Sequence, residues 1–195
     1  MTSVSALNHI CKIGLFGNHE NKNEENLLKV SEIKSLLIVQ VVQYKNSKVS
    51  FENIDIDGLN LKNEPQMVVS NNNTRILWNG PKNWFLVSTK KDLLKNILEA
   101  FKETDFAVTD LSHSRAIIEI EGNEVKEVLK KGCPYNFNIF EKNNSINSTY
   151  NGIAFTVDMI DDNPDKIRLF VLRSFGESLY HSITDSSLEF GYKVI

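Results

Sequence analysis

Two short apolar runs, at residues 74–80 and 83–88, flank a Gly-Pro turn near the middle of the chain. Runs of this length joined by such a turn predict a β-hairpin. Residues 92–103 then place apolar side chains at i, i+1, i+4, i+5 and i+8, which is typical of an amphipathic helix with one buried face. A strand is expected next, over residues 110–122.

The same order of elements recurs near the end of the chain. Residues 152–172 predict a second hairpin around an Asn-Pro turn, followed by a helix that begins after Ser174 and a last strand, YKVI. Hairpin, helix and strand thus occur twice, at residues 74–121 and 152–195. Two such units predict an α+β fold of antiparallel sheets covered by helices.

The rest of the chain gives weaker patterns. Residues 35–45 are rich in β-branched side chains and predict a strand, and residues 123–132 predict a short helix. Residues 141–151 are polar and are expected to form a loop. Residues 1–30 are polar and weakly periodic, which favours an extended arm. We therefore expect residues 1–195 to form a single domain that begins with this arm.

Composition excludes several classes of protein. The net charge is −3 and no basic patch is present, so nothing favours nucleic-acid binding. Two distant cysteines and four scattered histidines do not have the spacing of a disulfide framework or a structural zinc site. No apolar run is long enough to span a bilayer, and the N-terminus lacks the features of a signal peptide. A cytoplasmic protein is expected.

The stretch TDLSHSR, residues 109–115, contains the residue types of a Ser-His-Asp triad. In a straight strand, however, Ser112 and His113 point to opposite faces, so the relay cannot form. A structural role is favoured, in which Asp110 and the serines bind backbone groups. Arg115 would then pair with a carboxylate or lie at a subunit contact.

Three other groups of residues could have either a functional or a structural role. Cys133 follows a predicted helix C-terminus, which disfavours a reactive thiolate. The acidic residues 158–165 surround a hairpin tip and match no metal-binding loop, so turn chemistry is the better interpretation. Trp78 and Trp84 flank the first hairpin turn, where they are equally consistent with core packing and with an interface.

Several ordered motifs resemble the gamma subunit family of heterotetrameric sarcosine oxidase. They are LWNGPKNW at residues 77–84, DLSHSR at 110–115, KGCP at 131–134 and RSF at 173–175. The middle segment is also similar to the folate-binding domain of the aminomethyltransferases (the glycine-cleavage T-protein superfamily). The resemblance implies an aminomethyltransferase-like fold.

That second resemblance also bears on catalysis. The aminomethyltransferases carry paired acidic residues where this chain has Phe155 and Thr156. A phenyl ring and a hydroxyl cannot act as the carboxylate, so the resemblance implies a chain without catalytic or cofactor-binding residues. Trp78, Trp84, His113, Arg115 and Arg173 are the candidate subunit-interface residues.

The resemblance implies a non-catalytic subunit of a complex that demethylates sarcosine to glycine, with formation of hydrogen peroxide and methylenetetrahydrofolate. The implied partners are a large alpha subunit with beta and delta subunits, which would hold FAD, FMN, NAD, tetrahydrofolate and zinc. Two alternatives stay open: the equivalent subunit of an N-methylglutamate dehydrogenase complex, and a free-standing folate-binding protein.

Overall fold

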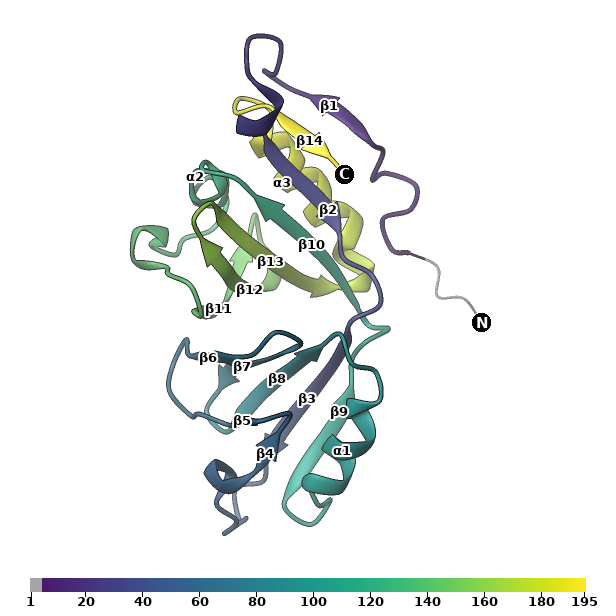
Figure 1. Cartoon of the computed structure of the whole chain (residues 1–195), viewed down its shortest axis with the longest axis vertical. Helices are drawn as coiled ribbons and strands as arrows, with labels where there is room; N and C mark the ends of the chain where they lie inside the picture. The colour runs from purple at the N-terminus through teal and green to yellow at the C-terminus, as the bar shows by residue number, and fades with distance from the viewer. Residues whose placement is uncertain (1–4) are drawn as a thin grey trace. The chain divides into compact units, whose positions relative to one another are not determined.

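The computed structural model describes residues 5–195, which divide into two compact units (Figure 1). Within the described residues, unit 1 consists of residues 5–34, 114–142 and 147–195, and unit 2 consists of residues 35–113 and 143–146. The sequence analysis treats the chain as one domain. The division is absent from the sequence pattern because the chain passes between the units through short segments that lack the composition of a linker.

Unit 1 is built on a seven-stranded sheet, counted over residues 5–195, with the order β1-β14-β2-β10-β13-β12-β11. The long central pairs, β10 with β13 and β12 with β13, are antiparallel, whereas β14 runs parallel to β2. The strands are β1 (Gly14–Phe16), β2 (Leu28–Glu32), β10 (Arg115–Glu121), β11 (Ser145–Tyr150), β12 (Ile153–Asp162), β13 (Asp165–Leu172) and β14 (Tyr192–Val194).

Two α-helices pack on this sheet, as Figure 1 shows for the longer one. They are α2 (Val125–Lys130) and α3 (Gly176–Ser187), and both contact β13 and each other. Leu179 and Ile183 of α3 are fully buried, in keeping with a helix that presents one apolar face to a sheet. The predicted second hairpin, the helix after it and the final strand are confirmed.

The N-terminal segment differs from the predicted arm. Leu7 is fully buried, and Leu28 and Val30 of β2 are 1% and 0% exposed. β2 pairs with β10, and β1 pairs with β14. The strand signal of this segment is weak because its strands are short and because they pair with strands more than 80 residues away. The prediction of an arm is therefore wrong for residues 5–30, and residues 1–4 lie outside the described structure.

Unit 2 contains a five-stranded sheet of order β6-β7-β8-β3-β9 and a small two-stranded sheet, counted over the described chain. The strands are β3 (Leu37–Gln43), β4 (Asp55–Ile56), β5 (Leu59–Asn60), β6 (Val68–Ser70), β7 (Thr74–Gly80), β8 (Asn83–Ser88) and β9 (Phe106–Asp110). The first predicted hairpin is confirmed as β7 and β8, and the strand predicted at residues 35–45 is β3.

The core of unit 2 lies under α1 (Leu93–Ala100). Leu93 and Ile97 of this helix belong to the same buried cluster as Val39 of β3 and Trp84 of β8. Four short 3-10 helices complete the described secondary structure: η1 (Glu24–Asn26), η2 (Phe51–Asn53), η3 (Phe137–Ile139) and η4 (Arg173–Phe175). The predicted α+β class, with mainly antiparallel sheets, is confirmed.

Two segments differ from the sequence pattern. Residues 110–122 do not form one strand, because β9 ends at Asp110 and β10 begins at Arg115, with a turn between them. Residues 141–151 are not simply a loop, since they contain β11, whose Tyr150 is fully buried. Asn and Ser are depleted in strands, so this polar edge strand gives almost no sequence signal.

Candidate subunit interface

The turn between β9 and β10 uses its polar side chains to bind backbone. Oδ1 of Asp110 accepts hydrogen bonds from the Ser112 backbone N–H at 2.9 Å and from the Ser112 hydroxyl at 2.5 Å. The Ser112 hydroxyl oxygen also accepts from the N–H of Ile38 at 3.0 Å, and the N–H of Leu111 donates to the Ile38 carbonyl at 2.7 Å. Asp110 and Ser112 therefore fix the end of β9 against β3, as the structural interpretation predicts.

No catalytic relay forms in this turn. His113 is exposed, and within residues 5–195 it makes no hydrogen bond to Ser112 or to Asp110. The predicted alternation of faces was wrong, because residues 111–114 form a turn instead of a strand. Asp110, Ser112 and His113 are therefore not arranged as a relay in this turn.

The two tryptophans of the first hairpin have different environments. Trp84 is 0% exposed and its indole N–H donates to the Lys62 carbonyl at 2.7 Å. Trp78 is partly exposed, and its indole N–H donates to Oδ1 of Asn63 at 3.3 Å. A residue in the core cannot contact another subunit, so the prediction of Trp84 as an interface residue is wrong. For Trp78 it stays a prediction.

Arg115 and Arg173 come together in unit 1. Arg115 is directly opposite Leu172 in the β10–β13 ladder, and the N–H of Arg173 donates to the Ser114 carbonyl at 2.9 Å. A surface depression of about 600 Å³ opens here, lined by Ser5, Ala6, Ser114, Leu172, Arg173 and Ser174. The arginines were predicted from separate motifs, and the sheet register brings them to one place.

Sequence reasoning missed two exposed apolar side chains, at the end of β13 and in the 3-10 helix after it. Leu172, at the end of β13, is 46% exposed, and Phe175, at the end of η4, is 48% exposed. The sequence signal is the run LFVLRSF, residues 169–175, which has more apolar residues than one buried sheet face can accept. Of the two, Leu172 lines the depression together with Arg173, so an apolar and a cationic residue meet there.

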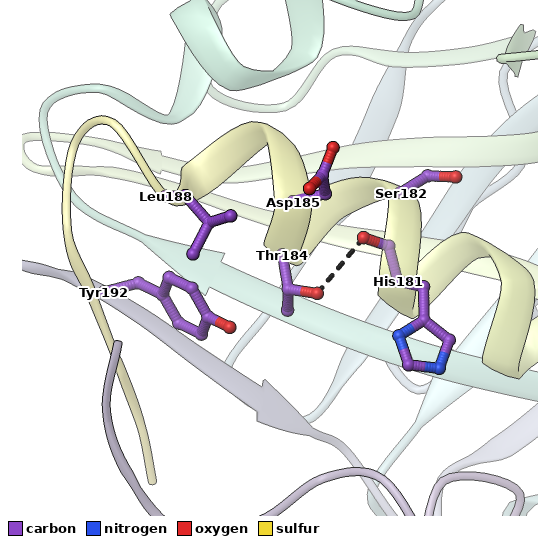
Figure 2. A pocket seen from close by; sticks show the side chains of 6 residues that line it. All are labelled: His181, Ser182, Thr184, Asp185, Leu188 and Tyr192. Carbon is purple, nitrogen blue, oxygen red and sulfur yellow. Dashed lines mark hydrogen bonds between the residues drawn. The ribbon is translucent and has the colours of Figure 1, made fainter. Parts of the chain in front are cut away.

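A second depression, of about 440 Å³, lies between α3 and β14 and is drawn in Figure 2. The Thr184 hydroxyl donates to the backbone carbonyls of Tyr180 at 2.8 Å and of His181 at 3.2 Å. Burial raises the pKa of the Tyr192 phenol, an effect that a hydrogen bond with Thr184 partly opposes. Thr184 thus forms hydrogen bonds within its own helix and with the phenol of Tyr192 in β14.

The described residues hold no group of three or more His, Cys, Asp or Glu side chains that could bind a metal ion. Within residues 5–195, no helix is both long and apolar enough to cross a membrane. Cys133 is buried and donates from its thiol to the Ser148 hydroxyl at 3.3 Å. This geometry agrees with a structural cysteine.

The positions of the paired aminomethyltransferase acids are also resolved. Phe155 is 4% exposed and its ring lies 6.2 Å from that of Tyr150. The Thr156 hydroxyl donates to Oδ1 of Asn147 at 2.6 Å. Neither side chain carries a carboxylate at the positions where the resemblance places the paired acids.

The fold shows the general class of protein to which the chain is similar. It matches glycine cleavage system aminomethyltransferase T from Bartonella henselae with a TM-score of 0.60 at 12% identity, over 87% of this chain and 48% of that one. The protein therefore has an aminomethyltransferase-like fold.

The family then follows from sequence. The model of the sarcosine oxidase gamma subunit family matches residues 53–189, and the chain belongs to this family. Sarcosine oxidase subunit gamma of Corynebacterium sp. (strain U-96) is 28% identical over 120 residues. This alignment covers 60% of this chain and 58% of the length of that relative.

A solved structure agrees with the family. A chain of the heterotetrameric sarcosine oxidase from Corynebacterium sp. U-96, in complex with pyrrole 2-carboxylate, matches with a TM-score of 0.80 at 21% identity. The match covers 96% of this chain and 95% of that one. The fold resemblance inferred from the motifs is thereby confirmed.

Proposed function

We propose that this protein is a non-catalytic subunit of a heterotetrameric sarcosine oxidase. The observation that carries the proposal is the family match over residues 53–189, which includes all four motifs that first indicated the resemblance. It favours sarcosine oxidase over an N-methylglutamate dehydrogenase or a free-standing folate-binding protein. Fold similarity at 21% identity supports only the architecture.

In this proposal the complex oxidatively demethylates sarcosine to glycine, and the chain contributes to assembly. Its partners are the large alpha subunit, with beta and delta subunits in the same complex. FAD, FMN, NAD, tetrahydrofolate and zinc belong to those partners, and this chain binds none of them. The side chains at Phe155 and Thr156 support that assignment, because neither provides the acidic group that folate chemistry requires.

We also propose a cytoplasmic location. Cys11 and Cys133 are unpaired in the described chain, as is usual for proteins in reducing compartments.

Co-expression of the full chain with the large subunit tests the proposal. We expect the two to co-purify through affinity and size-exclusion steps, with flavin absorbance in the complex and none in this chain alone. Calorimetry of the isolated chain with tetrahydrofolate is expected to give no binding heat. Separate elution of the two subunits would contradict the assembly role, and folate binding by the isolated chain would contradict the cofactor assignment.

A further inference from the structure

Arg115 is a half-buried cation without a counter-ion. Its Nη1 donates to the Ser114 hydroxyl at 3.2 Å and to the Ser114 carbonyl at 3.4 Å, and within residues 5–195 no carboxylate forms an ion pair with it. Burial alone lowers the pKa of the guanidinium, with no nearby charge contributing. A guanidinium has five N–H donors, so most of its capacity is unused in the isolated chain.

The other cations of the same sheet face are paired. Arg168 donates to Glu119 at 2.7 Å, and Lys166 bridges Glu119 and Glu121 at 3.1 Å and 2.9 Å. Arg115 lies on the same face of β10 as Glu119 and Glu121. The residue opposite it on β13, however, is the uncharged Leu172. Among the described residues, the ion pairs of this sheet face therefore do not extend to Arg115.

The environment of Arg115 resembles the centre of a protein interface. Leu172 is 46% exposed, and it lines the depression of about 600 Å³ together with Ser114, against which the guanidinium lies. Arginine is enriched at the buried centres of interfaces and among the few residues that dominate binding energy. We call Ser114, Arg115, Leu172 and Arg173 the docking surface.

We propose that the docking surface receives a segment of the partner subunit in which an Asp or Glu lies beside an apolar side chain. The carboxylate would bind the free N–H groups of Arg115, and the apolar side chain would cover Leu172. This inference rests on the proposed function, because it assumes that the chain assembles with a larger partner.

Charge complementarity supports a carboxylate as the occupant. A desolvated guanidinium gains most from a bidentate carboxylate, because both hydrogen bonds are charge-assisted. Residues 1–4, Met-Thr-Ser-Val, contain no acidic side chain. The net charge of −3 gives no general attraction to an acidic segment, so the recognition depends on this local cation.

Affinity for the co-expressed large subunit provides the first test. Arg115→Ala is expected to weaken binding at least about 30-fold, and Arg115→Glu further, because truncating one member of a buried charge pair leaves the other uncompensated. Leu172→Ser is expected to weaken binding about tenfold or more through lost apolar burial. Lys95→Ala is the matched control, since Lys95 is 82% exposed on α1, and it should leave the affinity unchanged.

A zero-length cross-link identifies the chemistry of the occupant. In Arg115→Lys, a carbodiimide should join the new amine to a partner carboxylate, and mass spectrometry of the peptide that spans position 115 locates that Asp or Glu. Thermal unfolding of each variant alone should match the wild type, which separates weaker docking from misfolding. If one variant misfolds, the Leu172→Ser variant tests the same surface independently.

The possible outcomes separate the two proposals. If the wild-type chain binds no partner subunit, the proposed function fails. If it binds and the Arg115→Ala variant binds equally well, or no cross-link forms at position 115 in a Lys variant that still assembles, the docking surface is refuted. Loss of self-association in Arg115→Ala, measured by sedimentation, would instead identify a second copy of this chain as the occupant and would also refute the proposal.

Discussion

The first residue of α3, Gly176, gives the most direct test of how unit 1 is packed. A Cβ atom built on Gly176 would lie 2.9 Å from the Cβ of Ala116 in β10 and 3.4 Å from Cδ2 of Leu7. Carbon atoms in good contact are about 3.5–4.0 Å apart, so the new methyl group is too close to Ala116 by at least about 0.6 Å. A methyl on a hydrogen-bonded strand cannot rotate away, so α3 or β10 must move.

The size of the effect follows from two opposing terms. Overpacking of a well-packed core reduces the free energy of unfolding by about 1–3 kcal/mol. Replacing Gly by Ala in a helix returns up to about 1 kcal/mol, and less at the first position. The backbone at Gly176 has φ −55°, so no strain arises from the conformation itself. We expect Gly176→Ala to lower the stability by about 1–2 kcal/mol, or the Tm by about 2–8 °C.

A double mutant isolates the contact. Ala116→Gly alone removes a methyl group from a strand and places glycine there, a loss of about 1–2 kcal/mol. If the two Cβ atoms compete for one space, Gly176→Ala in the Ala116→Gly background should cause little further loss. Additive losses within about 0.5 kcal/mol would show that the contact does not couple the two sites, and the packing argument would be refuted.

The assay has to report on unit 1. Both tryptophans, Trp78 and Trp84, lie in unit 2, so their fluorescence is unsuitable. Far-UV circular dichroism during urea and thermal unfolding follows α3 and the large sheet. Ser178→Ala is the control on the same helix, because Ser178 is exposed and the change should stay within about 0.5 kcal/mol of wild type.

Two further predictions concern residues inside the units. Trp84→Ala is expected to lower the free energy of unfolding in urea by about 3–5 kcal/mol, because Trp84 is fully buried. Trp78→Ala should lower it clearly less, because Trp78 is partly exposed. Equal losses would contradict the different burial of the two rings. The pKa of Glu121 is lowered by hydrogen bonds from Lys29 and then Lys166, so the stability it adds is fully present above its unfolded pKa near 4.5 and is lost as the pH falls further. Glu121→Gln should therefore lose less stability than wild type between about pH 5 and pH 3 in acid titrations followed by circular dichroism, and an unchanged pH dependence would contradict that role.

The parts of the fold that sequence predicts are those set by neighbours in the chain. The hairpin of β7 and β8 follows from a Gly-Pro turn, and α1 follows from its apolar stripe. β2 could not be predicted, because its pairing with β10 and β14 depends on residues more than 80 positions away. Local propensity carries no information about such partners.

The break between β9 and β10 is a second example of a long-range cause. Residues 106–121 have enough β-branched and apolar side chains to suggest continuous extended structure around a polar entry. The turn at residues 111–114 is fixed by hydrogen bonds from Ile38 and Leu111 between β3 and the turn. The sequence of the turn alone does not contain that information.

The candidate site was partly predictable for a related reason. Arg115 and Arg173 are recognisable as residues of motifs, but only the β10–β13 register places Arg115 opposite Leu172. Trp84 was a false candidate, because the hydrophobic pattern of a hairpin does not distinguish the core face near its turn from an exposed one.

The DLSHSR stretch can now be interpreted residue by residue. Asp110 and Ser112 satisfy backbone and side-chain groups at the end of β9, so these hydrogen bonds explain their presence without a catalytic role. His113 is exposed, and within residues 5–195 the guanidinium of Arg115 forms hydrogen bonds with the adjacent Ser114 alone. A half-buried cation with no carboxylate reduces the stability of the isolated chain. The stretch is therefore a structural turn, and it is followed by the arginine on which the proposed docking surface depends.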